Sequence, residues 1–232
     1  NVALGSNALY NNNTASNNTG VGFHALYDNT TGTQNVALGS ESLSANTTAD
    51  YNVAIGRSAL KVNTTGEYNT AIGGLALFDS TTASNNVAVG YLALYENTTA
   101  SNNTAVGTEA LRLNTTGTQN VAVGALALDA ATTGGTNTAV GYKALTSCTT
   151  AGSNTALGRT ALESDTTGAD NTALGTGSMQ FNTTGSDNVA VGKNALAYNT
   201  TASNNTAIGH DALLSNTTGT QNVALGSESL SA

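Results

Sequence analysis

Cysteine and charged side chains are both scarce in this chain of 232 residues. The single cysteine, Cys148, excludes an internal disulfide framework and a zinc site built from several cysteines. Charged residues make up 9% of the chain, compared with about 25% in ordinary globular proteins, and the formal net charge is −8. No cluster of lysine and arginine offsets this charge. The composition therefore argues against nucleic acid as a partner, because a phosphate backbone requires a basic surface.

Long apolar runs are also missing. No stretch approaches the 18 or so apolar residues of a transmembrane helix, so we expect no membrane span in this segment. The chain opens neither with methionine nor with the basic and then apolar pattern of a signal peptide. Both ends fall inside a repeated pattern, and we therefore expect the chain to be a fragment of a longer protein.

The abundant feature is a 17-residue unit, N-[TV]-A-[LIV]-G-x-x-[AS]-L-x-x-N-T-T-[GA]-x-x, which recurs through residues 1–232 as fourteen copies, the last incomplete. The glycines at position 5 follow one another at intervals of 17 from Gly5 to Gly226, with no insertion or deletion. A repeat of constant length is typical of coils that stack directly on one another. We therefore predict a single repetitive solenoid over residues 1–232.

A second level of repetition lies above this unit. The phrase NTTGTQNVALGSESLSA occurs at residues 29–45 and again at residues 216–232, an offset of 187 residues or eleven units. Units eleven apart are more alike than neighbouring units. This pattern indicates that a block of 187 residues was copied whole, and it predicts that the full gene continues past Ala232 with further copies.

The unit itself favours short strands. Phrases such as NVAIG and NTAVG are small and β-branched and end in glycine, as short strands do. Seventeen residues are too few for a helical repeat, which exceeds about thirty. The dipeptides Asn-Gly and Asp-Gly, which favour two-residue β-hairpin turns, do not occur, so the sequence does not indicate tight hairpins. These features predict an all-β fold, a parallel β-solenoid or β-roll with one coil per repeat.

Each repeat position then has an expected place in the coil. Positions 2 and 4 of the strand point one way and position 3 points the other. We predict a structural core ladder of Leu60, Leu77, Leu94, Leu111, Ile55 and Ile72. Because position 3 is always small and neutral, we predict that Ala54, Ala71 and Ala88 pack against another chain. Asn63, Thr64 and Thr65 are predicted to form a turn, since Asn and Thr side chains bond to local backbone groups.

Residues that could act as catalysts or metal ligands are few and scattered along the chain. His24 and His210 lie in distant coils, so no metal or catalytic cluster is expected, and Asp211 is expected to be a solvated neighbour of His210. Cys148 occupies a slot that is usually asparagine, and we interpret it as a tolerated turn substitution. No glycine-rich loop precedes a helix, so we expect no phosphate site. We predict no cofactor, no metal and no catalytic residue, and we expect that the chain is not an enzyme.

Two surface patterns have alternative interpretations. Asn29-Thr30-Thr31 and its copies match the acceptor pattern for N-glycosylation, but the same residues suit a structural turn, which we favour. Tyrosine and phenylalanine recur at two repeat positions, with Tyr10 and Tyr91 as examples. They are either scattered surface aromatics, which we favour, or a stripe on which sugars stack.

The phrases NVAIGRSAL and NTAIGHDAL resemble the head repeats of trimeric autotransporter adhesins, and similar arrays occur in trimeric phage tail-fibre shafts. The resemblance covers all fourteen units. It implies a left-handed parallel β-roll, three of which pack around an axis as a homotrimer with the aliphatic phrase inside. It also implies an extracellular location, on a cell surface or a virion.

We therefore expect a structural fibre shaft of a trimeric adhesin or tail-fibre-like protein, which holds a binding tip away from its anchor. A tip outside this chain would bind a host-surface glycan or protein. The alternative is a ligand-binding solenoid that recognises ice or a surface glycan through stacked Thr and Asn or Tyr rows. A carbohydrate-processing tailspike is a third possibility, but it would need paired carboxylates in one groove, and no such pair recurs.

Overall fold

The computed structural model describes residues 1–231, which form two compact units, Asn1–Thr118 and a second that begins at Gln119. Each unit is a parallel β-solenoid with one coil for each 17-residue repeat. Residues 1–231 contain no helix, and hence none long and apolar enough to cross a membrane. The predicted all-β parallel solenoid is confirmed.

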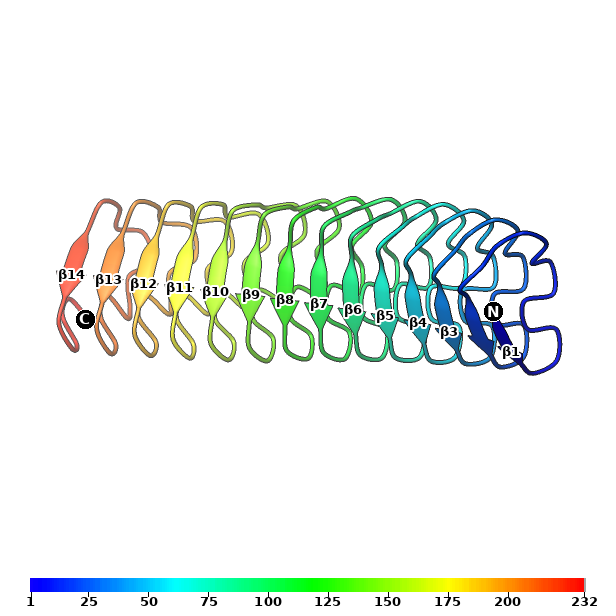
Figure 1. The fold of residues 1–232 in the computed structure, drawn as a ribbon. Helices are drawn as coiled ribbons and strands as arrows, with labels where there is room; N and C mark the ends of the chain where they lie inside the picture. The colour runs from blue at the N-terminus through cyan, green and yellow to red at the C-terminus, as the bar shows by residue number, and fades with distance from the viewer. Residues whose placement is uncertain (232) are drawn as a thin grey trace. The chain divides into compact units, whose positions relative to one another are not determined.

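Every coil contributes one strand of three residues. The first unit contains β1 (Val2–Leu4), β2 (Thr19–Val21), β3 (Val36–Leu38), β4 (Val53–Ile55), β5 (Thr70–Ile72), β6 (Val87–Val89) and β7 (Thr104–Val106). The second contains β8 (Val121–Val123), β9 (Thr138–Val140), β10 (Thr155–Leu157), β11 (Thr172–Leu174), β12 (Val189–Val191), β13 (Thr206–Ile208) and β14 (Val223–Leu225). Within each unit the strands lie side by side in chain order (Figure 1).

Strand pairing keeps one register throughout each unit. Ala54 lies opposite Ala71 between β4 and β5, and Ala139 lies opposite Ala156 between β9 and β10. Partners are therefore one repeat apart, and each repeat position forms a column of similar side chains. A one-residue insertion would turn every later strand side chain to the wrong face, which explains the constant repeat length.

The two faces of the strands are the reverse of the prediction. Ala54, Ala71 and Ala88 have no exposed surface in the single chain, so they lie in the coil interior and cannot contact a second chain. Ile72 is 37% exposed and Ile55 is partly exposed, so both belong to the outer face and not to the core ladder. The prediction for these five residues is corrected accordingly.

The leucine at position 9 explains why the small residue faces inward. A Cβ built on Gly20, at position 3 of the second coil, would lie 3.3 Å from Cγ of Leu9. The leucine therefore fills the interior opposite the strand and leaves room for only a methyl group or a hydrogen. The alternation of a strand then turns positions 2 and 4 outward.

The position 9 side chains form the core of each unit. Leu60, Leu77, Leu94 and Leu111 are all fully buried, in the core location that the sequence predicts for them. In the second unit the same column is fully buried from Leu128 to Leu196, with Met179 in the place of one leucine, whereas Leu230 in the last described coil is 61% exposed. Alanines at position 8 are also buried and complete the apolar interior.

The backbone of every coil is left-handed at positions 7, 9 and 17. Leu60 and Leu77, for example, have φ angles of 50° and 51°. Residues other than glycine rarely adopt this conformation, which costs about 1–2 kcal/mol per residue. It persists because the packing of the stacked coils determines the path of the chain.

Candidate functional site

The outward face of the strands is a regular apolar surface along each unit. Position 2 is always valine or threonine, position 4 is always leucine, isoleucine or valine, and neither is ever charged. Ile72, Leu157 and Ile208 are 37%, 47% and 39% exposed. Parallel pairing at about 4.8 Å places these side chains in straight columns. An exposed apolar surface of this regularity is typical of a face that a partner covers.

Buried asparagines hold the coils together through two columns of side chains. At position 1, the backbone N–H of Asn35 donates to Oδ1 of Asn18 at 2.9 Å, and its Nδ2 donates to the Ala49 carbonyl at 2.7 Å. At position 12, Nδ2 of Asn46 donates to Oδ1 of Asn29 at 2.7 Å and to the same Ala49 carbonyl at 3.0 Å. The two columns thus converge on the carbonyl of position 15.

The predicted turn residues belong to this network. Nδ2 of Asn63, which is fully buried, donates to the Gly66 carbonyl at 2.9 Å. The Thr64 hydroxyl donates to the Thr81 carbonyl of the next coil at 3.1 Å, whereas Thr65 is exposed. The threonines therefore contribute one exposed row per unit, because the hydroxyls of the other row are used within the stack.

The N-glycosylation pattern falls on an enclosed side chain. Asn29 has no exposed surface, and its Nδ2 donates to Oδ1 of Asn12 and to the Gly32 carbonyl, both at 2.9 Å. A glycan on this nitrogen would remove these contacts and could not fit inside the coil. The structure therefore gives this copy of the pattern a structural role.

Aromatic rings at equal repeat positions stack on one another. The Tyr10 and Tyr27 rings lie 5.3 Å apart with an interplanar angle of 6°. The other such pairs are Tyr51–Tyr68, Phe78–Tyr95 and Phe181–Tyr198. A sugar platform needs an open ring face, and stacking covers one face of each ring in these pairs. Tyr91 is half exposed and lies outside these pairs.

The two histidines lie in different units and have different surroundings. His24 stacks between Phe23 and Tyr27, with ring centroids 3.8 Å and 4.4 Å away. His210 Nδ1 lies 3.3 Å from an Asp211 carboxylate oxygen at a half-exposed site. Within residues 1–231 no three His, Cys, Asp or Glu side chains are grouped as metal ligands would be.

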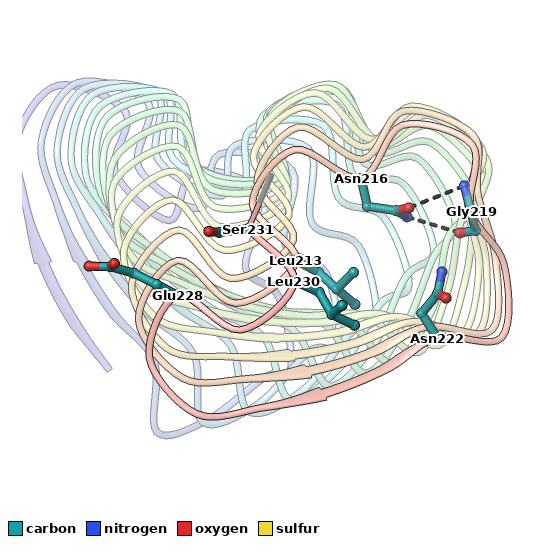
Figure 2. Close-up of a pocket in the computed structure, with 7 residues that line it drawn as sticks. All are labelled: Leu213, Asn216, Gly219, Asn222, Glu228, Leu230 and Ser231. Atoms are coloured by element: carbon teal, nitrogen blue, oxygen red, sulfur yellow. Dashed lines mark hydrogen bonds between the residues drawn. The ribbon is translucent and has the colours of Figure 1, made fainter.

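A hollow of about 600 Å³ lies at the last described coil. Figure 2 shows Leu213, Leu230, Asn216 and Asn222 among the residues that line it. These are residues of the leucine and asparagine columns, which are covered by the following coil elsewhere in the stack. The hollow is therefore the solenoid core seen from its end, and its lining contains no arrangement of catalytic groups.

The asparagine column of position 12 is interrupted, which the sequence analysis recognised only at Cys148. Ser80 stands there in the first unit and Ala131, Cys148 and Asp165 stand there in the second, and all four are fully buried. The buried atoms Asn63 Oδ1, Ser80 Oγ and Asp165 Oδ2 have no hydrogen-bond partner. The signal was available in the sequence, since Asp165 is an aspartate at a position that is asparagine in most repeats.

No family model matches the chain, and no curated protein matches it either. The functional interpretation therefore depends on the geometry of the solenoid.

Proposed function

We propose that the chain is the shaft of an extracellular homotrimeric fibre, as in surface adhesins and phage-type tail fibres. In this proposal its role is mechanical and not catalytic: it holds a binding tip, outside this chain, away from an anchor. The single observation that carries the proposal is the uncharged aliphatic face on the outside of the strands. Such a face is unfavourable in water and favourable when buried between chains.

The proposed interface consists of positions 2 and 4. Ile55 and Ile72 replace Ala54 and Ala71 as the residues expected to meet a second chain, because the alanines lie inside the coil. Three copies are proposed because the strand phrase resembles the head repeats of trimeric adhesins, in which the aliphatic phrase faces the trimer axis. The left-handed course of the coil is part of the same proposal.

The hydrogen bonds within each unit support a mechanical role. Backbone bonds such as Val53 N–H to the Asn69 carbonyl, at 2.8 Å, run from one coil to the next. The asparagine columns add side-chain bonds in the same direction. Pulling along the stack would therefore have to break many parallel bonds together, and no disulfide is needed.

A double substitution on the strand face tests the proposal. Ile55→Glu with Ile72→Glu places two charges on the outer face without entering the core, and we expect it to convert a trimer into monomers. The matched control is Thr48→Glu with Thr65→Glu, which adds the same charge to the exposed threonine row. Light scattering at micromolar concentration measures the mass. An unaltered chain that is monomeric under these conditions would refute the proposed shaft.

A ligand-binding solenoid is the alternative, and the exposed Thr65 row is the observation in its favour. An ice-binding surface would need a flat array, and the Thr64 hydroxyl is already used by the Thr81 carbonyl. Thermal hysteresis of a cooled solution, lost on substitution of Thr48 and Thr65 by Glu but kept in the strand-face variant, would favour this alternative.

A further inference from the structure

The asparagine column of the second unit contains a buried acid. Cys148, Asp165 and Asn182 occupy position 12 of three consecutive coils, and none of the three has exposed surface. An ionised carboxylate without a cationic partner is unfavourable in such a place. The contacts of its two oxygens show how the acid is accommodated.

One carboxyl oxygen of Asp165 replaces the oxygen of an asparagine amide. Asp165 Oδ1 accepts a hydrogen bond from Asn182 Nδ2 at 2.8 Å. One coil later, Oδ1 of Asn182 accepts from Asn199 Nδ2 at the same distance of 2.8 Å. The column therefore continues through Asp165 Oδ1, and Asp165 Oδ2 is left in the place of the amide nitrogen.

In the other coils that nitrogen is a donor. Asn182 Nδ2 donates to the Gly185 carbonyl and Asn199 Nδ2 to the Ala202 carbonyl, both at 2.9 Å and both three residues further along the chain. The equivalent carbonyl for Asp165 belongs to Gly168. A carboxylate oxygen cannot donate to it, whereas the hydroxyl of a carboxylic acid can.

We propose that Asp165 is a neutral carboxylic acid in the folded protein, with its Oδ2–H in the place of an asparagine Nδ2–H, and that its ionisation weakens the stack at this coil. The solenoid then contains one protonation-controlled weak point, between the coils of Cys148 and Asn182. Of the other residues in the column, the asparagines, Ser80 and Ala131 do not titrate, and burial raises the pKa of the Cys148 thiol to about 12.

The surroundings of Asp165 also favour its protonated form. Burial raises the pKa of Asp165 to about 7, although the hydrogen bonds from Asn182 and from the Gly168 backbone lower it. The titratable group that faces it is the Cys148 thiol, whose pKa burial and the Asp165 charge raise to about 12. The thiol is therefore neutral, and Asn182 and Gly168 carry no charge.

The sign of the pH dependence follows from this raised pKa. The carboxyl binds its proton more tightly in the folded protein than in the open chain, where its ordinary pKa is 3.8. Its stabilising contribution is complete below about pH 4 and is lost as the pH rises through about 7. Between these values the equilibrium constant for local unfolding of the stack at this coil, the opening constant, should rise about tenfold for each pH unit.

Hydrogen exchange at the two backbone bonds beside Asp165 tests the proposal. Thr149 N–H donates to the Thr166 carbonyl at 3.0 Å, and Thr166 N–H donates to the Thr183 carbonyl at 2.9 Å. After correction for intrinsic exchange, their opening constants should rise from pH 5 to pH 7 in the unaltered protein and stay flat in Asp165→Asn. Asp187→Asn, at an exposed aspartate, is the control and should keep the wild-type rise.

Carbon-13 NMR of the carboxyl groups provides an independent measurement. We expect Asp165 to titrate near pH 7 in the folded protein. A midpoint near 4 for the Asp165 carboxyl would overturn the proposal, as would an Asp165→Asn protein with the same pH slope as the unaltered chain. Asp165→Asn restores the residue found in most coils, so failure to fold is not expected.

Discussion

Glycine at position 5 is a residue that the coil geometry itself requires. Gly56 has φ of +129°, and a Cβ added to it would lie 2.6 Å from the carbonyl carbon and oxygen of Gly73 in the next coil. Residues other than glycine rarely adopt this φ angle. Because the clashing atoms belong to the backbone, rotation of a side chain cannot relieve the contact. Gly73 meets Gly90 in the same way one coil later.

A pair of alanine substitutions tests this requirement. Gly56→Ala should lower the free energy of unfolding by about 2–4 kcal/mol or prevent folding, because it combines backbone strain with a steric clash. Gly74→Ala is the matched control, since its Cβ would meet only the Tyr91 ring, at 3.6 Å. Urea denaturation followed by circular dichroism measures both. Equal stability of the two variants would contradict the close approach of the coils.

At the scale of the element, the position 12 column is a chain of hydrogen bonds between asparagine side-chain amides, and the chain is interrupted in some coils. Where two asparagines follow one another in the column, the Oδ1 of the first accepts from the Nδ2 of the second, as Asn29 does from Asn46. Ser80 interrupts the column in the first unit, and both Asn63 Oδ1 and Ser80 Oγ are buried without a partner. Each such group costs about 1–3 kcal/mol relative to a satisfied one.

Ser80→Asn should therefore stabilise the protein. The new Nδ2 would donate to Asn63 Oδ1, and the coil shape accommodates asparagine at this position in its neighbours. We expect a gain of about 2 kcal/mol or more, because the substitution removes two unpaired buried groups that cost about 1–3 kcal/mol each. Ser80→Ala is the control, because it removes the unpaired hydroxyl but leaves Asn63 Oδ1 unpaired, and it should gain less. Thermal unfolding distinguishes them, and a loss of stability in Ser80→Asn would show that this coil lacks the space.

At the scale of the whole molecule, every strand in a unit pairs with strands one repeat away, and stability is shared between neighbouring coils. A substitution in the core should consequently lower the stability of its own coil and the adjacent coils first. This behaviour differs from that of a globular domain, in which a cavity weakens one cooperative core. Apart from Asp165, which is fully buried in the asparagine column, the charged side chains lie at surface positions of the repeats.

Leu77→Ala tests the local nature of the damage. Loss of this fully buried side chain should cost about 2–5 kcal/mol. Hydrogen exchange should accelerate first at the Thr70 amide, which donates to Asn86 in the same region, and later at the Thr19 amide, which donates to Asn35. Thr65→Ala, at an exposed site outside the strand face, should cost about 1 kcal/mol or less. Equal acceleration at both amides would indicate a single cooperative core.

The sequence predicted the structure correctly at repeat positions where a single property, such as constant spacing or a large apolar side chain, determines the location of the residue. The constant length of 17 residues predicted stacked coils, and the leucines of position 9 were placed in the core. The prediction failed for the strand faces because both are small or aliphatic, and hydrophobicity alone does not choose between them. The buried acid at Asp165 was visible as a departure from asparagine, but its burial was not.

By itself, the sequence determined the solenoid, its period and the columns of like residues, because a strict repeat allows only a stack in which equal positions meet. The tertiary structure alone decided which side of the strand lies inside. Leu9 and its equivalents occupy the interior and leave room there for only a methyl group, so Ala54 turns inward and Ile55 and Ile72 turn outward. It also decided the left-handed backbone at Leu60 and Leu77, since no local preference of leucine favours that conformation and only packing between coils maintains it.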